Sequence, residues 1–518
     1  MRHMRSAGDL QTLADLCLVH GQRYGDSIAL IDADVALSYA DFAVRARRVS
    51  SALVDLGLRP GERVVLIGRN SVGWVSIAFG ILLAGATVVP IGFANSAKER
   101  QHVIDLTEPR LVLVEDPDDR QPEARQLSFA TVLRAAANAE PRADADLPQV
   151  RPEDVALIMS TSGSTGVPKQ VPMAHGQLIR LYTDVAVRLG LASEDRSLGA
   201  VPLAHSFGFN GVLLSASLVG AAVRLVWHYD RTTLAELIVQ ERLTSIIGPP
   251  TILFDLIGSG RPDVAATCRR AISGGSDVPL EQMRSACARL GIPQMFVGYG
   301  LTETCGTVAI GDVTHAEPGT LPMLTPVKDV DIAIVDTDGR PVPAGVSGHI
   351  RCRGYNVVTG YIGDERATAA AIDGQGWLDT GDIGWFDMQG RLCIAARAKD
   401  TVIVSGFNVY PREVEHVLLE HESVAEAVVL GIVDERQGQR LVACLIPAAG
   451  RRIEPERLVD HCRDRLTAYK VPRTFVELED FPTTPSGKRS RASLYVQVTE
   501  TLASRQPQSP AVPRQHGR

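Results

Sequence analysis

Hydrophobic positions in the first 150 residues follow the helical period in some stretches and run without a break in others, as in helices that alternate with strands. The clearest helix begins near Ser38 and Asp41, which resemble a capping box, and Gly57 stands where a C-terminal cap belongs. One face of this helix carries Phe42, Val49, Leu53 and Leu56. A short strand is predicted to follow over 63–67. The alternation predicts layered α/β structure.

Two uncharged stretches, 70–97 and 197–223, have the length of a membrane span. Glycines and Pro90 interrupt the first, and its end has the pattern of a strand, so we predict a helix followed by a buried strand. The second contains His205, Asn210 and several glycines, and we interpret it as interior. The sequence predicts no integral membrane contact.

The chain changes character twice. Polar residues, Ala and Pro dominate 117–150, which we interpret as a surface excursion, and a joint to a smaller domain is predicted near 397. The elements predicted around and beyond this joint are strands over 391–395, 401–404, 425–433 and 440–446, a helix from Pro411 and a helix over 454–467. The predicted domains are 1–397, 398–500 and a disordered tail, 501–518.

Composition limits the possible functions. The chain has 518 residues, 45% hydrophobic and 22% charged, which excludes a single small module and wholesale disorder. A formal net charge of −7 provides no general attraction for nucleic acid or anionic lipid, so small molecules are the expected ligands. Eight cysteines without a CxxC pair are interpreted as reduced core thiols of a cytoplasmic protein, and the N-terminus lacks the apolar segment of a signal peptide.

A glycine-rich turn, Thr-Ser-Gly-Ser-Thr-Gly-Val-Pro-Lys at 161–169, follows an apolar strand predicted over 155–159. Its glycines let backbone N–H groups converge on an anion, its hydroxyls can donate to phosphate oxygens, and Lys169 adds a point charge. It is not a Walker A loop, because a proline precedes the lysine and a glutamine follows it. We interpret the segment as a triphosphate cradle, and the alternative is a flexible Gly/Ser turn.

Three further motifs accompany this turn: Tyr-Gly-Leu-Thr-Glu at 299–303 after a strand predicted over 294–297, Gly-Trp-Leu-Asp-Thr-Gly-Asp at 376–382, and Pro-Thr-Thr-Pro-Ser-Gly-Lys at 482–488. In these residues, their order and their spacing, over roughly residues 10–495, the sequence resembles the adenylate-forming superfamily of acyl- and aryl-CoA synthetases, peptide-synthetase adenylation domains and beetle luciferase. The resemblance implies a large multi-layer α/β N-terminal domain with the ATP and acyl pocket, and a small mobile α+β C-terminal domain.

The resemblance also implies an acyl-CoA synthetase that uses ATP, Mg²⁺ and coenzyme A in two half-reactions. In the first, the loop that bears Lys488 closes on the substrates, and acyl-AMP forms as pyrophosphate leaves. The second begins with a rotation about Lys399. This rotation withdraws the loop and brings up the segment around Gly406, whose missing side chain leaves room for a pantetheine arm.

The resemblance assigns the site residues position by position. Glu303 offers a carboxylate to Mg²⁺, Asp382 on a tight Thr-Gly-Asp turn suits the ribose hydroxyls, and Lys488 offsets repulsion between the acid and the α-phosphate. The predicted catalytic residues are Lys488, His205, Thr302 and Glu303. The predicted nucleotide and coenzyme residues are Thr161, Ser162, Gly163, Ser164, Thr165, Gly166, Lys169, Ser273, Gly274, Gly275, Tyr299, Gly300, Thr302, Asp382, Arg397, Lys399 and Gly406. Taken alone, each has an ordinary structural interpretation.

Lysine usage bears on these assignments. Of 53 Lys and Arg residues only six are Lys, and three of them, Lys169, Lys399 and Lys488, fall on motif positions. Such positions favour a compact ammonium over a planar fork, and the alternative is composition bias with coincidence. Two residues depart from the family pattern: Gln170 and Ala396 replace the usual glycines. Either substitution can slow adenylation or alter the hinge, although neither removes a charged participant.

The class of acid is predicted from what the motifs contain. Amino-acid-activating relatives place an Asp after the Phe of the motif around His205, whereas 205–211 offers no such anion. We therefore predict a fatty, aryl or polycyclic acid rather than an amino acid, and Gly298, Gly300 and Gly306 suggest space for a large or flat group.

Two alternatives remain. One is an acyl-AMP ligase that delivers to a carrier protein or performs a single half-reaction, although the short interval from Asp382 to Arg397 has no obvious room for the insertion that such relatives carry. The other is a non-catalytic nucleotide-binding protein. A homodimer and a carrier-protein partner stay open, and nucleic acid is not a predicted partner.

Overall fold

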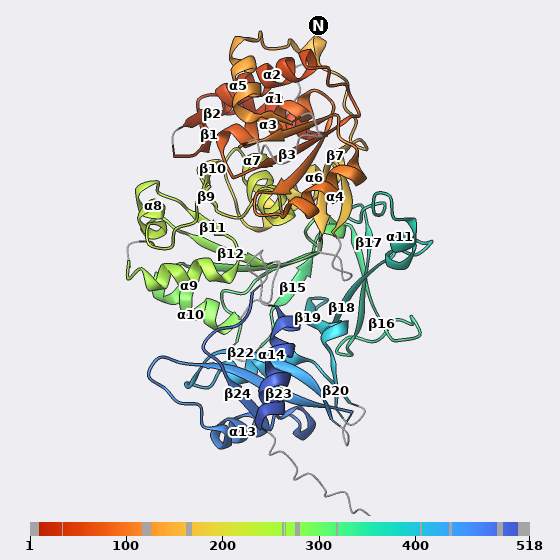
Figure 1. Ribbon diagram of the computed structural model, residues 1–518. Helices are drawn as coiled ribbons and strands as arrows, with labels where there is room; N and C mark the ends of the chain where they lie inside the picture. Colours follow the sequence, from red (N-terminus) through yellow and green to blue (C-terminus); the bar gives the residue numbers. More distant parts are fainter. Residues whose placement is uncertain are drawn as a thin grey trace, which may run out of the picture. The chain divides into compact units, whose positions relative to one another are not determined.

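The computed structural model describes residues 10–33, 35–116, 126–161, 168–261, 264, 266–274, 280–317, 320–404, 407–434, 438–483 and 490–505. Contacts divide the chain into two units, which Figure 1 colours along the sequence. The first comprises Met1–Ala316, Pro322–Thr380 and Trp385–Cys393, and the second Glu317–Leu321, Gly381–Gly384 and Ile394–Arg518. This division falls at Ile394, whereas the sequence placed the joint after residue 397.

Two sheets organise the described part of the first unit. The smaller has six strands in the order β6 (Gln126–Ser128), β5 (Leu111–Val114), β3 (Arg63–Gly68), β4 (Thr87–Gly92), β7 (Val155–Thr161) and β8 (Lys169–Ala174). Its neighbouring strands are parallel except for the antiparallel pair β7 and β8. Parallel strands buried on both faces have continuous apolar runs, as in Val64–Ile67, and helices must cover them.

The larger sheet connects 13 strands in the described part of the chain, and two of them, β18 and β19, have residues assigned to both units. The order is β16 (Val330–Val335), β17 (Gly348–Gly354), β18 (Leu378–Phe386), β19 (Leu392–Arg397), β15 (Met323–Pro326), β14 (Ala309–Asp312), β13 (Gln294–Tyr299), β12 (Arg270–Gly274), β11 (Ser245–Ile247), β9 (Arg196–Gly199), β10 (Ala222–Leu225), β1 (Ile28–Ile31) and β2 (Ala36–Ser38). Strands β9 to β13 are parallel, so their carboxyl ends share one edge.

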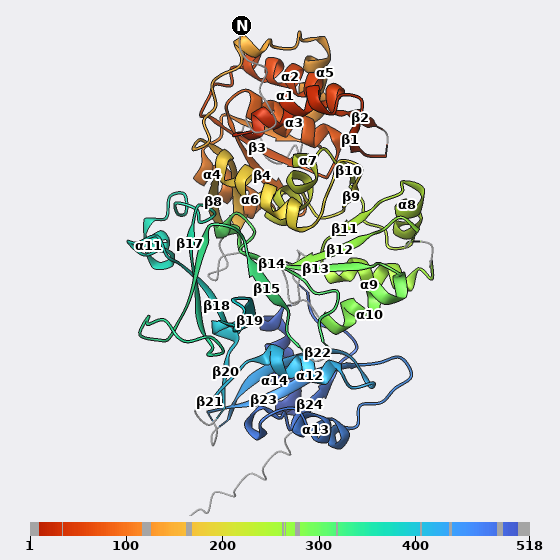
Figure 2. The same ribbon diagram turned by 180° about the vertical axis from the view of Figure 1, so that it is seen from behind.

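Helices of the first unit cover these sheets. Figures 1 and 2 show α1, α2, α3 and α5 gathered together, and α2 contacts the other three. The helices are α1 (Leu13–Arg23), α2 (Tyr39–Asp55), α3 (Val72–Leu83), α4 (Ala97–Thr107), α5 (Phe129–Asn138), α6 (His175–Arg188), the π-helix η2 (Phe207–Leu214), α7 (Ser215–Leu218), α8 (Leu234–Gln240), α9 (Pro250–Gly258), α10 (Leu280–Leu290), the short turns η1 (Asp144–Asp146) and η4 (Thr302–Thr304), and α11 (Glu365–Ala371).

The second unit packs helices on both faces of a small sheet. One face buries Val414 and Leu418 of α12 with Leu458 of α13, and the other buries Leu494 and Val498 of α14. The elements are η5 (Ala398–Asp400), β20 (Val402–Val404), β21 (Phe407–Val409), α12 (Pro411–Leu419), β22 (Val424–Asp434), β23 (Gly438–Pro447), α13 (Pro455–Arg463), η6 (Ala468–Lys470), β24 (Thr474–Glu477) and α14 (Arg491–Arg505).

Several local predictions are confirmed. The Ser38 side chain accepts a hydrogen bond from the Asp41 N–H at the start of α2, and Gly57 after its end has φ +89°. The uncharged stretch 70–97 forms α3 and β4 rather than one long helix. Within the described residues, no helix has the length and apolarity needed to cross a bilayer. All eight cysteines are buried and free.

Two predictions are wrong. The supposed surface excursion contains β6 and α5, and α5 buries Phe129, Val132 and Ala136 against the core. These residues have the i, i+3, i+7 spacing of a helix face, which the Ala-rich composition concealed. The predicted tail also starts too early, because α14 continues to Arg505. Residues 506–518 lie outside the described residues.

A buried carboxylate joins three parallel strands at their amino ends. Asp195, 1% exposed, accepts hydrogen bonds from Arg270 at 2.7 Å, Arg269 at 2.7 Å and Thr244 at 2.6 Å. Burial raises the pKa of Asp195, but the hydrogen bonds from Thr244 and Arg270 outweigh it and hold the pKa below its usual range. Asp195 is therefore a charged structural link between β9, β11 and β12.

We predict that Asp195→Asn lowers the free energy of unfolding of the first unit by about 3 to 5 kcal/mol, because it leaves Arg270 buried without its anion. Urea unfolding followed by tryptophan fluorescence measures this, since all four tryptophans lie in the first unit. The difference in free energy of unfolding between the variant and the native protein should have its full size at neutral pH. It should become smaller as the pH falls through the lowered pKa, because Asp195 of the native protein is then protonated as well. Asp338→Asn, in an exposed pair with Arg340, should change the midpoint little.

Candidate functional site

The glycine-rich turn joins two antiparallel strands. Thr161 at the end of β7 is paired directly with Lys169 at the start of β8. The predicted phosphate-binding residues between them, Ser162, Gly163, Ser164, Thr165 and Gly166, lie outside the described residues. The structure therefore places both ends of the turn, and the Lys169 side chain emerges where the strand pair begins.

Gln170, one of the two departures from the family pattern, has a structural role. It is 1% exposed, and its amide exchanges hydrogen bonds with the Ser160 hydroxyl across the strand pair, at 3.0 and 3.2 Å. Its backbone carbonyl accepts from the Ile362 N–H at 2.9 Å. The side chain that replaces the usual glycine thus cross-links the strands at the base of the turn. Ala396, the other departure, is buried in β19.

The motif around Glu303 forms a tight turn at the carboxyl end of β13. Thr302, Glu303 and Thr304 make the short helix η4, and Cys305 follows it with φ +53°. η4 contacts β7, so this turn lies beside the strand that leads into the glycine-rich turn. The Glu303 carbonyl accepts from the Val358 N–H at 3.0 Å. Two motifs 140 residues apart are thereby brought together where the two sheets meet.

Some glycines near this turn allow close packing, whereas another leaves open space. A Cβ at Gly300 would lie 2.3 Å from the Gly306 carbonyl oxygen, and one at Gly306 would lie 2.5 Å from the Tyr182 hydroxyl. The space that we predicted at these two positions is therefore filled by backbone and tyrosine. Gly298 differs, because its nearest neighbour would be 4.0 Å away. Gly274 also allows a close approach, because a Cβ there would lie 2.6 Å from the Gly298 carbonyl oxygen.

The other residues predicted around the nucleotide base are only partly described. Ser273 is the penultimate residue of β12 and is paired with Val297. It is buried, and its hydroxyl has no hydrogen-bond partner among the described residues. Tyr299 ends β13 and is partly exposed. Gly275 lies outside the described residues.

Tyr361 links the two motifs and was missed by the sequence analysis. Its hydroxyl donates to the Glu303 Oε1 at 2.9 Å, and the Lys169 Nζ lies 4.3 Å from the centre of its ring. Burial, and then the charge of Glu303, raises the pKa of Tyr361, so the hydroxyl keeps its proton and acts as a donor. The only sequence signal is an aromatic residue between Gly360 and the helix that begins at Glu365, which is too common to single out.

Glu303 fits the way in which proteins hold Mg²⁺. This ion is usually bound through one or two carboxylates, with phosphates and water as the remaining ligands. Among the described residues, no group of three or more His, Cys, Asp or Glu side chains is arranged for a metal ion. Glu303 offers one carboxylate, with one oxygen already bound by Tyr361, and Thr302 offers a hydroxyl nearby. These groups suit an ion whose remaining ligands come from phosphate and water rather than from protein side chains.

His205 lies two residues before the π-helix η2, a rare form that often marks functional segments. Its Nδ1 accepts from the Phe207 N–H at 3.1 Å, which assigns the ring proton to Nε2. The preceding segment is held by Asn70, whose Nδ2 donates to the carbonyls of Gly199 and Val201 at 3.0 and 2.8 Å. The Asn70 Oδ1 accepts from the Leu203 N–H at 2.9 Å. Asn70 thus ties the smaller sheet to the His205 segment.

Asp382 and Arg397 meet in the second unit, where Arg397 Nε lies 3.0 Å from Asp382 Oδ1. The predicted Thr-Gly-Asp turn is wrong, because these residues lie within β18, and Gly381 with φ +68° provides the local irregularity. Asp382 is 2% exposed. The backbone of Lys399 lies in η5, while its side chain, Gly406 and Lys488 lie outside what the structure describes.

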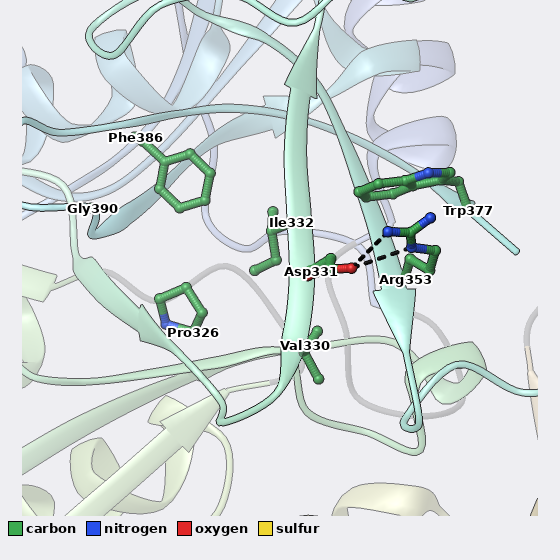
Figure 3. Close-up of a pocket in the computed structure, with 8 residues that line it drawn as sticks. All are labelled: Pro326, Val330, Asp331, Ile332, Arg353, Trp377, Phe386 and Gly390. Carbon is green, nitrogen blue, oxygen red and sulfur yellow. Dashed lines mark hydrogen bonds and ion pairs between the residues drawn. The ribbon is translucent and has the colours of Figure 1, made fainter. Parts of the chain in front are cut away.

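A surface hollow lies apart from these residues in the first unit. Figure 3 shows Arg353 between Trp377 and Asp331, with its guanidinium 4.6 Å from the Trp377 ring and 2.9 Å from the Asp331 Oδ2. The other lining residues are Pro326, Val330, Ile332, Phe386 and Gly390. None of the predicted site residues lines this hollow.

We predict that Gly300→Ala destabilises the Glu303 turn, whereas Gly298→Ala does not. The added methyl group at residue 300 meets backbone, which cannot rotate away, and such overpacking costs about 1 to 3 kcal/mol. Tryptophan fluorescence during urea unfolding would show the lower midpoint for Gly300→Ala. Equal midpoints for the two variants would contradict the packing described here.

Comparison with known proteins places these features in one family. Residues 18–362 match the model of the AMP-binding enzyme family, and 413–488 match the model of the AMP-binding enzyme C-terminal domain. The chain is 34% identical to a feruloyl-CoA synthase of Amycolatopsis sp, over 88% of this chain and 92% of that enzyme. It is 32% identical to the indoleacetate–CoA ligase of Aromatoleum aromaticum, over 87% of this chain and 91% of that enzyme.

A solved structure agrees with these matches. The anthranilate CoA ligase AuaEII in complex with anthranoyl-AMP superposes with a TM-score of 0.85 at 25% identity, covering 96% of this chain and all of that one. With both family models matched in the predicted order and relatives similar along most of their length, the chain belongs to the AMP-binding enzyme family.

Proposed function

We propose that this protein is an AMP-forming acid–thiol ligase that activates a carboxylic acid as acyl-AMP and transfers the acyl group to coenzyme A. One observation of the structure carries the proposal: the end of the glycine-rich turn and the Glu303 turn come together on Tyr361. Lys169 and Glu303 are close but form no ion pair among the described residues, so the lysine can bind a triphosphate and the carboxylate can bind its magnesium ion. The CoA-ligase relatives support the same reaction.

In the first half-reaction, a carboxylate oxygen attacks the α-phosphorus, and the bond to the pyrophosphate oxygen breaks. The turn at 161–169 binds the phosphates, with Lys169 as the cation. Glu303 and Thr302 would hold Mg²⁺, which neutralises phosphate charge when bound. Lys488 would stand between the two reacting anions and reduce their repulsion.

The base and ribose have their own predicted contacts. Tyr299 and the segment 273–275 would hold the adenine. Asp382 and Arg397, already paired in the second unit, would hold the ribose.

In the second half-reaction, the thiolate of the acceptor attacks the acyl carbon, and AMP leaves with the bonding electrons. Lys399 would be the hinge of the second unit, and Gly406 would leave space for the pantetheine arm. His205, fixed through its Nδ1 by the π-helix backbone, would present its Nε2–H beside the reacting carbonyl. A cytoplasmic location and a homodimer stay predictions.

The acid is proposed to be fatty, aryl or polycyclic. The relatives named for ferulate, indoleacetate and a two-ring propanoate derivative support a bulky or aromatic acid without an α-amino group. The segment that follows His205 carries Asn210 and no acidic residue, so an α-ammonium has no anion to pair with there. Gly298 leaves room beside β12 for a flat group.

An exposed patch favours coenzyme A over a carrier protein as the acceptor. The Arg69 guanidinium lies 3.7 Å from the ring centre of Phe93 and 5.5 Å from that of Trp227, and the two rings are 38% and 54% exposed. Arg69 also lies within 3.5 Å of Glu115 and Asp116. Flat exposed rings beside a guanidinium can stack on an adenine, which coenzyme A has and a carrier-bound phosphopantetheine lacks. Asn70, the next residue, holds the His205 segment.

Product analysis tests the proposed function. We expect mass spectrometry of a reaction with ATP, Mg²⁺, coenzyme A and a mixed acid library to show AMP, pyrophosphate and an acyl-CoA. An acyl-AMP that accumulates with coenzyme A present would favour the carrier-protein alternative. The absence of both products with every acid would overturn the ligase proposal.

We predict that Trp227→Ala raises the KM for coenzyme A about 10-fold, the effect expected when a base loses an aromatic stacking partner. The KM for phosphopantetheine, which has no adenine, should stay within a factor of two of the native value. Steady-state kinetics with the two acceptors at saturating ATP and acid measures the difference. An equal increase for both acceptors would refute the adenine contact.

A further inference from the structure

Tyr361 occupies a fixed position between two groups of opposite charge. Its N–H donates to the Thr368 hydroxyl at 2.9 Å, and the N–H of the next residue, Ile362, donates a hydrogen bond to the Gln170 carbonyl. The preceding Gly360 has φ +145°, and a Cβ there would lie 2.5 Å from the Thr368 side chain. The backbone that carries this half-buried ring is therefore anchored to α11 on one side and to β8 on the other.

The hydroxyl of Tyr361 fixes one oxygen of Glu303. With Oε1 accepting from Tyr361 at 2.9 Å, the carboxylate is held in one orientation, and Oε2 faces no other partner among the described contacts. A hydrogen bond to a charged acceptor contributes more than one between neutral groups. The bond thus selects one rotamer of Glu303 before any ligand arrives.

The ring of Tyr361 holds Lys169 away from that carboxylate. The ammonium lies 4.3 Å from the ring centre, and no ion pair joins Lys169 to Glu303 among the residues that the structure describes. A cation–π contact at a partly exposed site is weak, whereas a direct Lys–Glu pair would neutralise both charges that a triphosphate and its metal require. Because the ring contact is weak, a phosphate can draw the lysine away at little cost.

We propose that Tyr361 is a positioning residue for adenylation: its ring keeps Lys169 apart from Glu303, and its hydroxyl orients the Glu303 carboxylate. This inference rests on the proposed function, in which Lys169 binds phosphate and Glu303 serves the magnesium ion. It assigns separate roles to the two parts of one side chain, and two substitutions can distinguish them.

The test compares Tyr361→Phe, which removes the hydroxyl, with Tyr361→Leu, which also removes the ring. Tyr355→Phe is the matched control, because Tyr355 lies on the same loop and carries the Arg180 guanidinium 3.9 Å from its ring centre, while its hydroxyl has no hydrogen bond among the described contacts. Three quantities are measured for each purified full-length variant: pyrophosphate exchange, thioester formation from supplied acyl-AMP, and the Kd of Mg²⁺-ATP by calorimetry.

For Tyr361→Phe we expect the kcat of pyrophosphate exchange to fall about 10- to 100-fold, the range for loss of a hydrogen bond to a charged group, with little change in the Kd of Mg²⁺-ATP. For Tyr361→Leu the Kd should also rise about 10-fold, because Lys169 can then pair with Glu303. Adding Lys169→Ala to Tyr361→Leu should therefore cost less affinity than in the native protein. Thioester formation and the thermal midpoint should stay near native values.

The inference would be overturned if Tyr361→Phe catalysed pyrophosphate exchange with the native kcat and Tyr361→Leu bound Mg²⁺-ATP with the native Kd. Equal losses in both half-reactions with a lowered thermal midpoint would also overturn it, because they would indicate a general structural role. If the native protein forms no acyl-AMP from any acid, the proposed function fails. The calorimetric comparison would then still decide whether Tyr361 positions Lys169 for Mg²⁺-ATP.

Discussion

The carbonyl group of Cys305 is the point on which the geometry of the site depends. Cys305 has φ +53°, an unfavourable region for a side chain with a Cβ, and it is fully buried. Two donors from different helices, the Tyr182 hydroxyl at 2.9 Å and the Asn210 amide at 3.1 Å, bond to its carbonyl. Their hydrogen bonds offset the strain and fix the direction in which the chain leaves η4. These bonds hold the backbone that follows Glu303, while the Tyr361 hydroxyl orients its carboxylate.

The same contacts tie the segment proposed to bind the acid to the turn proposed to serve the nucleotide. Asn210 belongs to the π-helix that starts beside His205, and Tyr182 belongs to α6, which follows β8. A displacement of the π-helix would therefore reach the Cys305 carbonyl through the hydrogen bond from Asn210. Gly306 is part of this junction, because φ +102° and the nearby Tyr182 hydroxyl exclude a side chain there. Coupling by contiguous hydrogen bonds needs no large movement.

What the sequence predicted correctly is local. The cap at Ser38, the strand that begins at Val155 and the break of the apolar stretch before β4 each depend on neighbouring residues whose pattern is visible in the chain. The contacts of Tyr361 with Glu303 and of Tyr182 with Cys305 join residues 58 and 123 positions apart. No periodicity encodes such pairs, since they arise only when β7 and η4 meet at the junction of the sheets. The motifs indicated which residues are candidates for the chemistry, but they did not indicate which tyrosines hold those residues in position.

Gln170 shows how a departure from a family pattern can be compensated locally. A glycine after the lysine would leave the Ser160 hydroxyl without its partner, whereas the glutamine amide satisfies this hydroxyl and fills the space between the strands. The resulting cross-link stiffens the base of the glycine-rich turn. Through its backbone carbonyl, the same residue also holds the segment that carries Tyr361. The Gln170 side chain therefore supports the strand pair at the base of the glycine-rich turn, and its backbone carbonyl supports the segment that carries Tyr361.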